Sequence, residues 1–149
     1  MEGRVEDELQ RQLRDLLCLA VVGDHLRWVL IGDGRAELAG WLTGASAAWR
    51  DWAEQAAQEL AASGIAPDGR IRSLAKDIPL NWVPDGWLTA DAGRRLVADR
   101  LDTVSEWARY RRSQASGAHA ELLGVICSGY EEQLQDLREL AGSSASANA

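Results

Sequence analysis

The chain has 149 residues, of which 46% are hydrophobic and 26% are charged, and its formal net charge is −7 at pH 7. This length and composition are typical of one globular domain rather than of a disordered chain. The negative net charge disfavours binding to the phosphate backbone of nucleic acids. No apolar run reaches the roughly 20 residues of a membrane helix, and the opening MEGRVEDELQ is unlike a signal peptide. We therefore expect a cytoplasmic protein with no membrane partner, for which nucleic acid is a poor partner.

Apolar side chains recur at helical spacing in most of the chain, and no segment shows the alternation of a strand. The pattern predicts helices over 5–31 and 35–63, a third that begins after Thr89 as its N-cap, and a fourth from about 116 to 141. The links at 32–34 and 112–117 are short, whereas 64–88 is long and contains three prolines and a predicted short helix at 71–76.

Four long helices with one long middle connection predict an all-α, ferritin-like four-helix bundle in which that connection crosses over. Residues 1–141 would form this single domain. The last segment, 142–149, consists of small and polar residues and predicts a disordered tail. Cys18 and Cys127 lie far apart, without the spacing of a metal site, so we expect two buried, reduced thiols.

The first helix carries two charged residues on its apolar stripe. Asp24 and Arg27 follow Leu17 and Ala20 on the same line, and Ile31 comes after them. Two explanations remain open. Either this end of the helix emerges into solvent, or the two charges face a buried or interfacial polar site, where each needs a partner.

Several stretches resemble the Dps family, ferritin-like proteins of starved bacteria. The family pattern H-W-N-V-x-G-x-x-F-x-x-L-H-x-x-x-D is similar to RWVLIG at 27–32, followed by Arg35, Leu38, Ala39 and Thr43. The connection, with GIAPDGR at 64–70 and PDGWL at 84–88, is similar to that of actinobacterial Dps proteins. The fourth helix aligns from Glu121 through Glu131 without a gap. The resemblance implies a ferritin-like bundle over nearly the whole chain.

The resemblance also shows which residues stand where the family binds iron. Dps proteins oxidise ferrous iron at a site shared by two subunits. The two histidines of that site fall on Arg27 and Ala39, its aspartate on Thr43, and the partner's two carboxylates on Glu54 and Gln58. Iron prefers imidazole and carboxylate ligands, and a guanidinium repels it. The sequence therefore predicts no metal site, no cofactor and no conventional ferroxidase.

Other family features are also missing at the expected places. The histidines of this chain, His25 and His119, lie outside the iron positions, and we expect both to be exposed. Family members that condense DNA do so largely through basic tails, whereas the acidic start and the uncharged end of this chain do not suit DNA.

The chain has seven tryptophans and no phenylalanine. Trp28 matches the family's own tryptophan. Trp41, Trp49 and Trp52 follow at spacings that project them toward a similar side of the second helix, which forms the dimer contact in the family. One interpretation is that these rings fill an apolar interface between subunits. The other is that they line a pocket for a flat organic molecule.

These considerations define a candidate site. Its ligand-binding residues would be Asp24, Arg27, Trp28, Ala39, Trp41, Thr43, Trp52, Glu54 and Gln58. Glu54, Asp24 and Arg27 are the candidates for catalysis, because a desolvated carboxylate could act as an acid or base. We also expect Arg27 to pair with Glu54 of the partner subunit, unless Asp24 captures it first.

Two functions follow. The first is a divergent Dps-like protein without a ferroxidase centre, acting as a non-catalytic structural or regulatory homo-oligomer. This oligomer would be a dimer at least, with the family's dodecamer as the larger alternative. The alternative is a repurposed protein that binds, or transforms, an aromatic small molecule at the former iron site without metal or cofactor.

Overall fold

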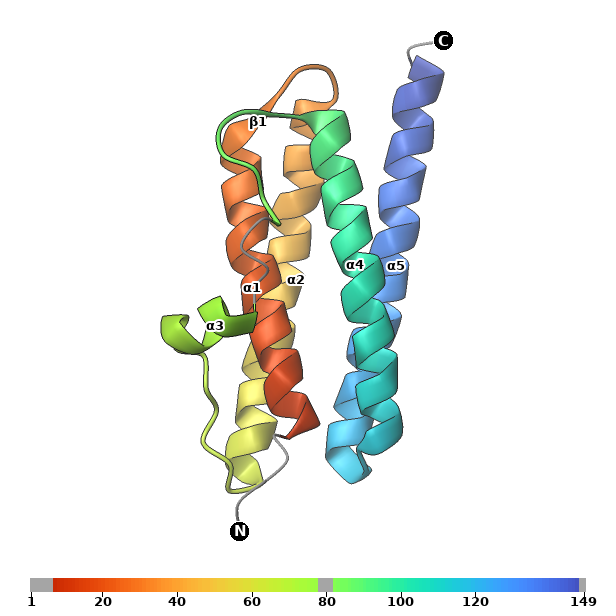
Figure 1. Cartoon of the computed structure of the whole chain (residues 1–149). Helices are drawn as coiled ribbons and strands as arrows, with labels where there is room; N and C mark the ends of the chain where they lie inside the picture. Colours follow the sequence, from red (N-terminus) through yellow and green to blue (C-terminus); the bar gives the residue numbers. More distant parts are fainter. Residues whose placement is uncertain (1–6, 78–81, 148–149) are drawn as a thin grey trace.

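The computed structural model describes residues 7–77 and 82–147. Four long helices lie side by side in a bundle, and a short helix lies outside it in the connection between the second and third (Figure 1). The long helices are α1 (Glu8–Val29), α2 (Arg35–Ala62), α4 (Ala90–Gln114) and α5 (Gly117–Ala147), and the short one is α3 (Ile71–Asp77). The predicted all-α, ferritin-like bundle with a crossover is confirmed.

The helix ends follow from local sequence signals. The side chain of Asp7 accepts a hydrogen bond from the Leu9 amide at 2.8 Å and caps α1. Thr89 caps α4 as predicted, with its hydroxyl accepting from the Ala92 amide at 3.2 Å. Gly34 has a φ of 84°, which lets the chain reverse tightly between α1 and α2. These signals set the helix lengths and therefore which side chains face one another.

The core is a column of leucine and alanine side chains with two large aromatic residues. Trp49 is 1% exposed and its indole N–H donates to Gln133 Oε1 at 2.8 Å. Tyr130 is fully buried, and its hydroxyl accepts a hydrogen bond from Gln12 Nε2 at 2.6 Å. These polar groups inside the bundle are paired, as buried donors and acceptors must be.

The long connection is attached to α1 at two places. Near the start of α1, the Gln10 amide donates to the Asp68 carbonyl and accepts from the Asp68 N–H, each at 2.8 Å. Near its end, β1 (Leu30–Ile31) pairs in parallel with β2 (Leu88–Thr89). The sequence predicted no strand, and this two-residue ladder corrects that prediction. It is too short to show any alternation of apolar and polar residues.

The last helix, α5, ends later in the chain than the domain boundary predicted from the sequence. Helix α5 continues to Ala147, past the predicted limit at residue 141, and residues 148–149 lie outside the described part of the chain. The tail over 142–149 therefore remains only a prediction. Across the described residues, no helix combines the length and the apolar character needed to cross a membrane.

Candidate functional site

The centre of the candidate site is the Asp24 carboxylate, which lies between two guanidinium groups. Arg27, on the next turn of α1, donates to Asp24 Oδ1 at 2.9 Å, and Arg50 of α2 lies 2.5 Å from Oδ2. The side chains of Asp24 and Arg27 are 21% and 29% exposed. The two charges on the α1 stripe are therefore half-buried and paired, which favours a polar site over a simple emergence into solvent.

These contacts determine the electrostatics of the cluster. The hydrogen bond from Arg27 lowers the pKa of Asp24 below its usual range, and Arg50 acts in the same direction against the opposing effect of burial. Asp24 is therefore ionised at neutral pH and suits anchoring cations better than accepting protons. One carboxylate faces two cations, and the buried Nε of Arg27 has no hydrogen-bond acceptor in the described part of the chain.

A hollow lies beside this cluster. It has a volume of about 500 Å³, and Asp24, Trp28 and Arg50 contribute to its lining. The other lining residues are apolar or titratable: Val21, Val22, His25, Val83, Pro84 and Asp85. Trp28 is 69% exposed, so its ring is accessible to a ligand or a partner.

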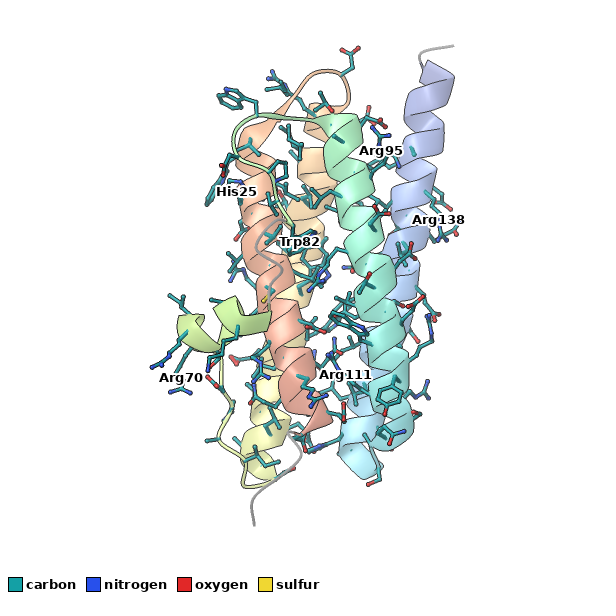
Figure 2. The ribbon with its side chains drawn as sticks, in the orientation of Figure 1. His25, Arg70, Trp82, Arg95, Arg111 and Arg138 are labelled. Carbon is teal, nitrogen blue, oxygen red and sulfur yellow. The ribbon has the colours of Figure 1, made fainter. Side chains whose placement is uncertain are left out.

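His25, which we expected to be exposed, is half-buried in this wall, and Figure 2 places it on α1. His119 is also half-buried, 2.8 Å from the Ser63 hydroxyl. The expectation that both histidines are exposed was wrong. The neighbouring segments, which helical spacing alone does not reveal, cover these rings.

Arg50 links the hollow to a second one. The second hollow, of about 310 Å³, is lined by Arg50 and Glu54 together with apolar residues of α1, of α2 and of the connection that follows α2. Sequence reasoning missed Arg50, although one signal was available. It precedes Glu54 by one helical turn and therefore shares its face of α2.

The structure does not bring the remaining predicted polar residues into the cluster. The Thr43 hydroxyl is exposed and donates to the Ala39 carbonyl at 3.0 Å. Glu54 and Gln58 are exposed further along α2. Among the described residues, no hydrogen bond or ion pair joins these side chains to Asp24 or Arg27.

The tryptophans of α2 lie against the interior of their own bundle. Trp41 packs edge-on against the buried Trp49, with ring centroids 6.3 Å apart. Trp52 packs edge-on against Tyr130 of α5 at 6.0 Å. Their spacing correctly predicted a shared side, but that side faces the core. Of the three tryptophans proposed for the site, Trp28 is the one that lines the hollow beside Asp24.

The donor chemistry at the positions that the resemblance assigns to iron does not fit a metal ion. Arg27 is a cation, Ala39 has no donor atom in its side chain, and the Thr43 hydroxyl is engaged with the backbone. Glu54 alone keeps a carboxylate. The described residues contain no group of three or more histidine, cysteine, aspartate or glutamate side chains that could hold a metal ion together.

Comparison with known proteins gives a match at the level of structure. Neither models of protein families nor characterised protein sequences match the chain. A solved structure of a Dps protein from Deinococcus radiodurans is similar, with a TM-score of 0.84, 20% identity, and coverage of 89% of this chain and 82% of the other. Dps from Microbacterium arborescens in its high iron form has a TM-score of 0.83 and 19% identity, with coverage of 90% of this chain and 90% of the other. A Dps protein of Streptomyces coelicolor has a TM-score of 0.81 and 20% identity, with coverage of 89% of this chain and 80% of the other.

The chain therefore has the ferritin-like fold of the Dps proteins. At such low identity the likeness is one of fold. What these neighbours do with iron is a property of those proteins, and the residues of this chain decide its own function.

Proposed function

We propose that this protein is a Dps-like homo-oligomer without a ferroxidase centre, with a structural or regulatory role in the cytoplasm. One observation carries the proposal. Arg27, at a position where the resemblance expects a metal-binding histidine, is a permanent cation bonded to Asp24 at 2.9 Å. The thiols of Cys18 and Cys127 are buried and not joined in a disulfide, which is compatible with a reducing compartment.

The exposed face of α2 supports assembly. Ala36, Gly40, Gly44 and Ala47 are exposed and leave that part of the helix without bulky side chains. A second helix could therefore approach closely, and the exposed Trp28 adds apolar surface on α1. By resemblance to the Dps family, α2 would contact a second copy of the chain.

Such an interface gives Arg27 a second acceptor. Its buried Nε has no hydrogen-bond acceptor within the described chain, and Glu54, exposed on α2, makes no hydrogen bond or ion pair with the described residues. In the proposed dimer, Arg27 pairs with Glu54 of the partner subunit while keeping Asp24. An ion pair would then stand where Dps proteins hold iron.

Two measurements test this proposal. Purified protein should not oxidise ferrous iron faster than buffer does, and sedimentation at micromolar concentration should show a dimer or a larger assembly. Iron oxidation that saturates with protein and disappears in Glu54→Ala would refute the loss of the ferroxidase centre. A monomer that persists at these concentrations would refute the assembly.

The hollow beside Asp24 supports a second candidate function, the binding of an aromatic small molecule without metal. Its volume of about 500 Å³ lies within the range of ligand pockets. The exposed Trp28 ring provides a stacking surface, and Arg50 provides a cation for an acidic group. Because the pKa of Asp24 is lowered, this residue would hold the arginines in place rather than transfer protons.

Binding can be measured with indole-3-carboxylate as the probe, by calorimetry. Trp28→Leu should weaken binding at least tenfold. Trp87→Leu is the matched control, because Trp87 is equally exposed, at 71%, but does not line this hollow. Equal effects of the two substitutions, or no binding by the unmodified protein, would refute a ligand at this place.

A further inference from the structure

A separate hollow lies between the start of α1 and the end of α4. Its volume is about 420 Å³, and its lining includes Glu8 and Asp15 from α1 and Trp107, Tyr110 and Arg111 from α4. Figure 2 shows Arg111 between these two helices. None of these residues belongs to the Asp24 cluster, so whatever this hollow binds is independent of the proposed function.

The floor of this hollow is a buried polar network. Arg111 Nη1 lies 2.5 Å from Asp15 Oδ2 and donates to Gln12 Oε1 at 2.9 Å. The side chains of Arg111 and Asp15 are 10% and 7% exposed. Gln12 continues the network to the buried Tyr130 hydroxyl at 2.6 Å. Because these groups satisfy one another across three helices, the floor is fixed before any ligand arrives.

The aromatic wall is held equally firmly. The Arg100 guanidinium lies between two indoles, 4.8 Å from the Trp82 centroid and 5.2 Å from that of Trp107. Arg111 lies 5.7 Å from the same Trp107 ring. Arginine and tryptophan thus alternate along one stripe of α4, and each cation is attracted to the neighbouring ring. Trp107 remains 40% exposed and Tyr110 62% exposed, so both offer aromatic surface to the hollow.

One atom of this hollow lacks a hydrogen bond. Glu8 Oε2 is buried and has no hydrogen-bond donor in the described part of the chain. The guanidinium of Arg111 faces this oxygen, but its Nε lies 4.0 Å away, which is beyond hydrogen-bond distance. A buried carboxylate oxygen without a donor is costly, and a donor supplied by a ligand would remove that cost.

The charges around Glu8 restrict what that donor can be. Three arginines, Arg11, Arg14 and Arg111, line the hollow against the two carboxylates of Glu8 and Asp15. The Arg111 guanidinium already lies 4.0 Å from Glu8 Oε2, so a cationic ligand group placed there would meet a like charge, and we take the donor to be an uncharged O–H or N–H group. The aromatic walls favour a planar ring of one or two cycles.

We infer that this hollow binds a neutral planar aromatic molecule whose O–H or N–H group donates to Glu8, with its ring against Trp107 and Tyr110. The ligand class is that of phenols and indoles. The floor and wall are preorganised by contacts within the chain, so binding requires no rearrangement of the bundle.

Two probes that differ in one donor test the inference. Indole carries an N–H group, whereas 1-methylindole has the same rings without it. Titration of ¹⁵N-labelled protein should move the indole N–H signal of Trp107, assigned by Trp107→Phe, with saturation. Indole should bind about tenfold more tightly than 1-methylindole, which reflects a hydrogen bond to a charged acceptor.

Variants separate this site from the fold and from the Asp24 hollow. Glu8→Ala should abolish the preference for indole over 1-methylindole, and Tyr110→Ala should weaken both probes alike. Trp28→Leu should leave both affinities unchanged, so a failure at this site is distinguishable from a failure of the proposed function. Equal binding of the two probes, a shift of Trp28 instead of Trp107, or no saturable shift at millimolar concentration would overturn the inference.

Discussion

Asp24 on α1 and Arg50 on α2 form an ion pair with an N–O distance of 2.5 Å. The same carboxylate also binds Arg27, so one residue holds two cations at the junction of the two helices. Both arginines are therefore oriented within the subunit. Any partner or ligand that reaches this face meets a prearranged positive cluster rather than free side chains.

The first prediction concerns the contact between subunits. In a double-mutant cycle with Arg27→Met and Glu54→Gln, read out as dimer dissociation, the two effects should not be additive. Because Arg27 is partly exposed and already shares Asp24, we expect a coupling free energy of about 0.5–1 kcal/mol. With Asp24→Asn as background, the coupling should grow, since the competing acceptor is neutral. Additivity in both backgrounds would show that Arg27 and Glu54 do not meet.

A second prediction follows from the lowered pKa of Asp24. The ordinary pKa of an aspartate in an unfolded chain is about 3.9. Asp24 therefore stabilises the fold at pH values above about 4, and this contribution disappears as the pH falls through the lower pKa of the folded state. Urea unfolding of the unmodified protein and of Asp24→Asn should differ at pH 7, and the difference should shrink as the pH falls below about 4. A difference that stays constant with pH would contradict the ion pairs as its cause.

The third prediction concerns the packing of α5 against α2. A methyl group at Gly129 would lie 2.3 Å from Trp52 Cη2, so Gly129→Ala forces this indole out of its contact with Tyr130. We expect a loss of about 1–3 kcal/mol in the free energy of unfolding. Trp52→Leu should reduce the effect of the added methyl group.

Gly124→Ala is the matched control on the same helix. Its added methyl group meets only the end of the flexible Arg112 side chain, at 3.1 Å. Because alanine favours helix over glycine, this variant should be neutral or more stable by up to about 1 kcal/mol. Equal destabilisation by both substitutions would mean that helix propensity, rather than Trp52, controls the result.

The fourth prediction concerns alkaline pH. Complete burial, followed by the negative charge of Asp15, raises the pKa of Tyr130 well above its usual value of about 10. Its stabilising contribution is complete below pH 10 and is lost at higher pH, because the unfolded chain releases the phenolic proton and the folded chain does not. Chemical unfolding should show a decline above pH 10 that is smaller in Tyr130→Phe. The same decline in both proteins would assign it to other groups.

The sequence predicted the helices and their order well, because each relies on local signals. Thr89 is one such signal, since an N-cap needs only its own side chain and the amides that follow it. The parallel contact between Leu30 and Leu88 depends instead on where the connection returns, which no local pattern contains. For this reason the helices were predicted and the short ladder was not.

The candidate site was predicted only in part. Charges on an apolar stripe drew attention to Asp24 and Arg27, which the structure pairs with each other. Arg50 also pairs with Asp24, but it lies on the exposed face of α2, where an arginine is common. The tryptophans show a different limit. Spacing fixes the angle between Trp49 and Trp52 on a helix, whereas the rotation of that helix relative to its neighbours follows from packing of the whole bundle.

The attachment of the connection to α1 has a further consequence. Gln10 of α1 binds Asp68, and Leu30, in the strand that directly follows α1, pairs with Leu88, so the two halves of the connection are held at opposite ends of α1. If the connection were cut once between Asp68 and Leu88, each of its halves would still be held by its own contact, at Gln10 or at Leu30. The chain could then be divided there into two separately expressed fragments, with α1 as the template on which the second fragment assembles.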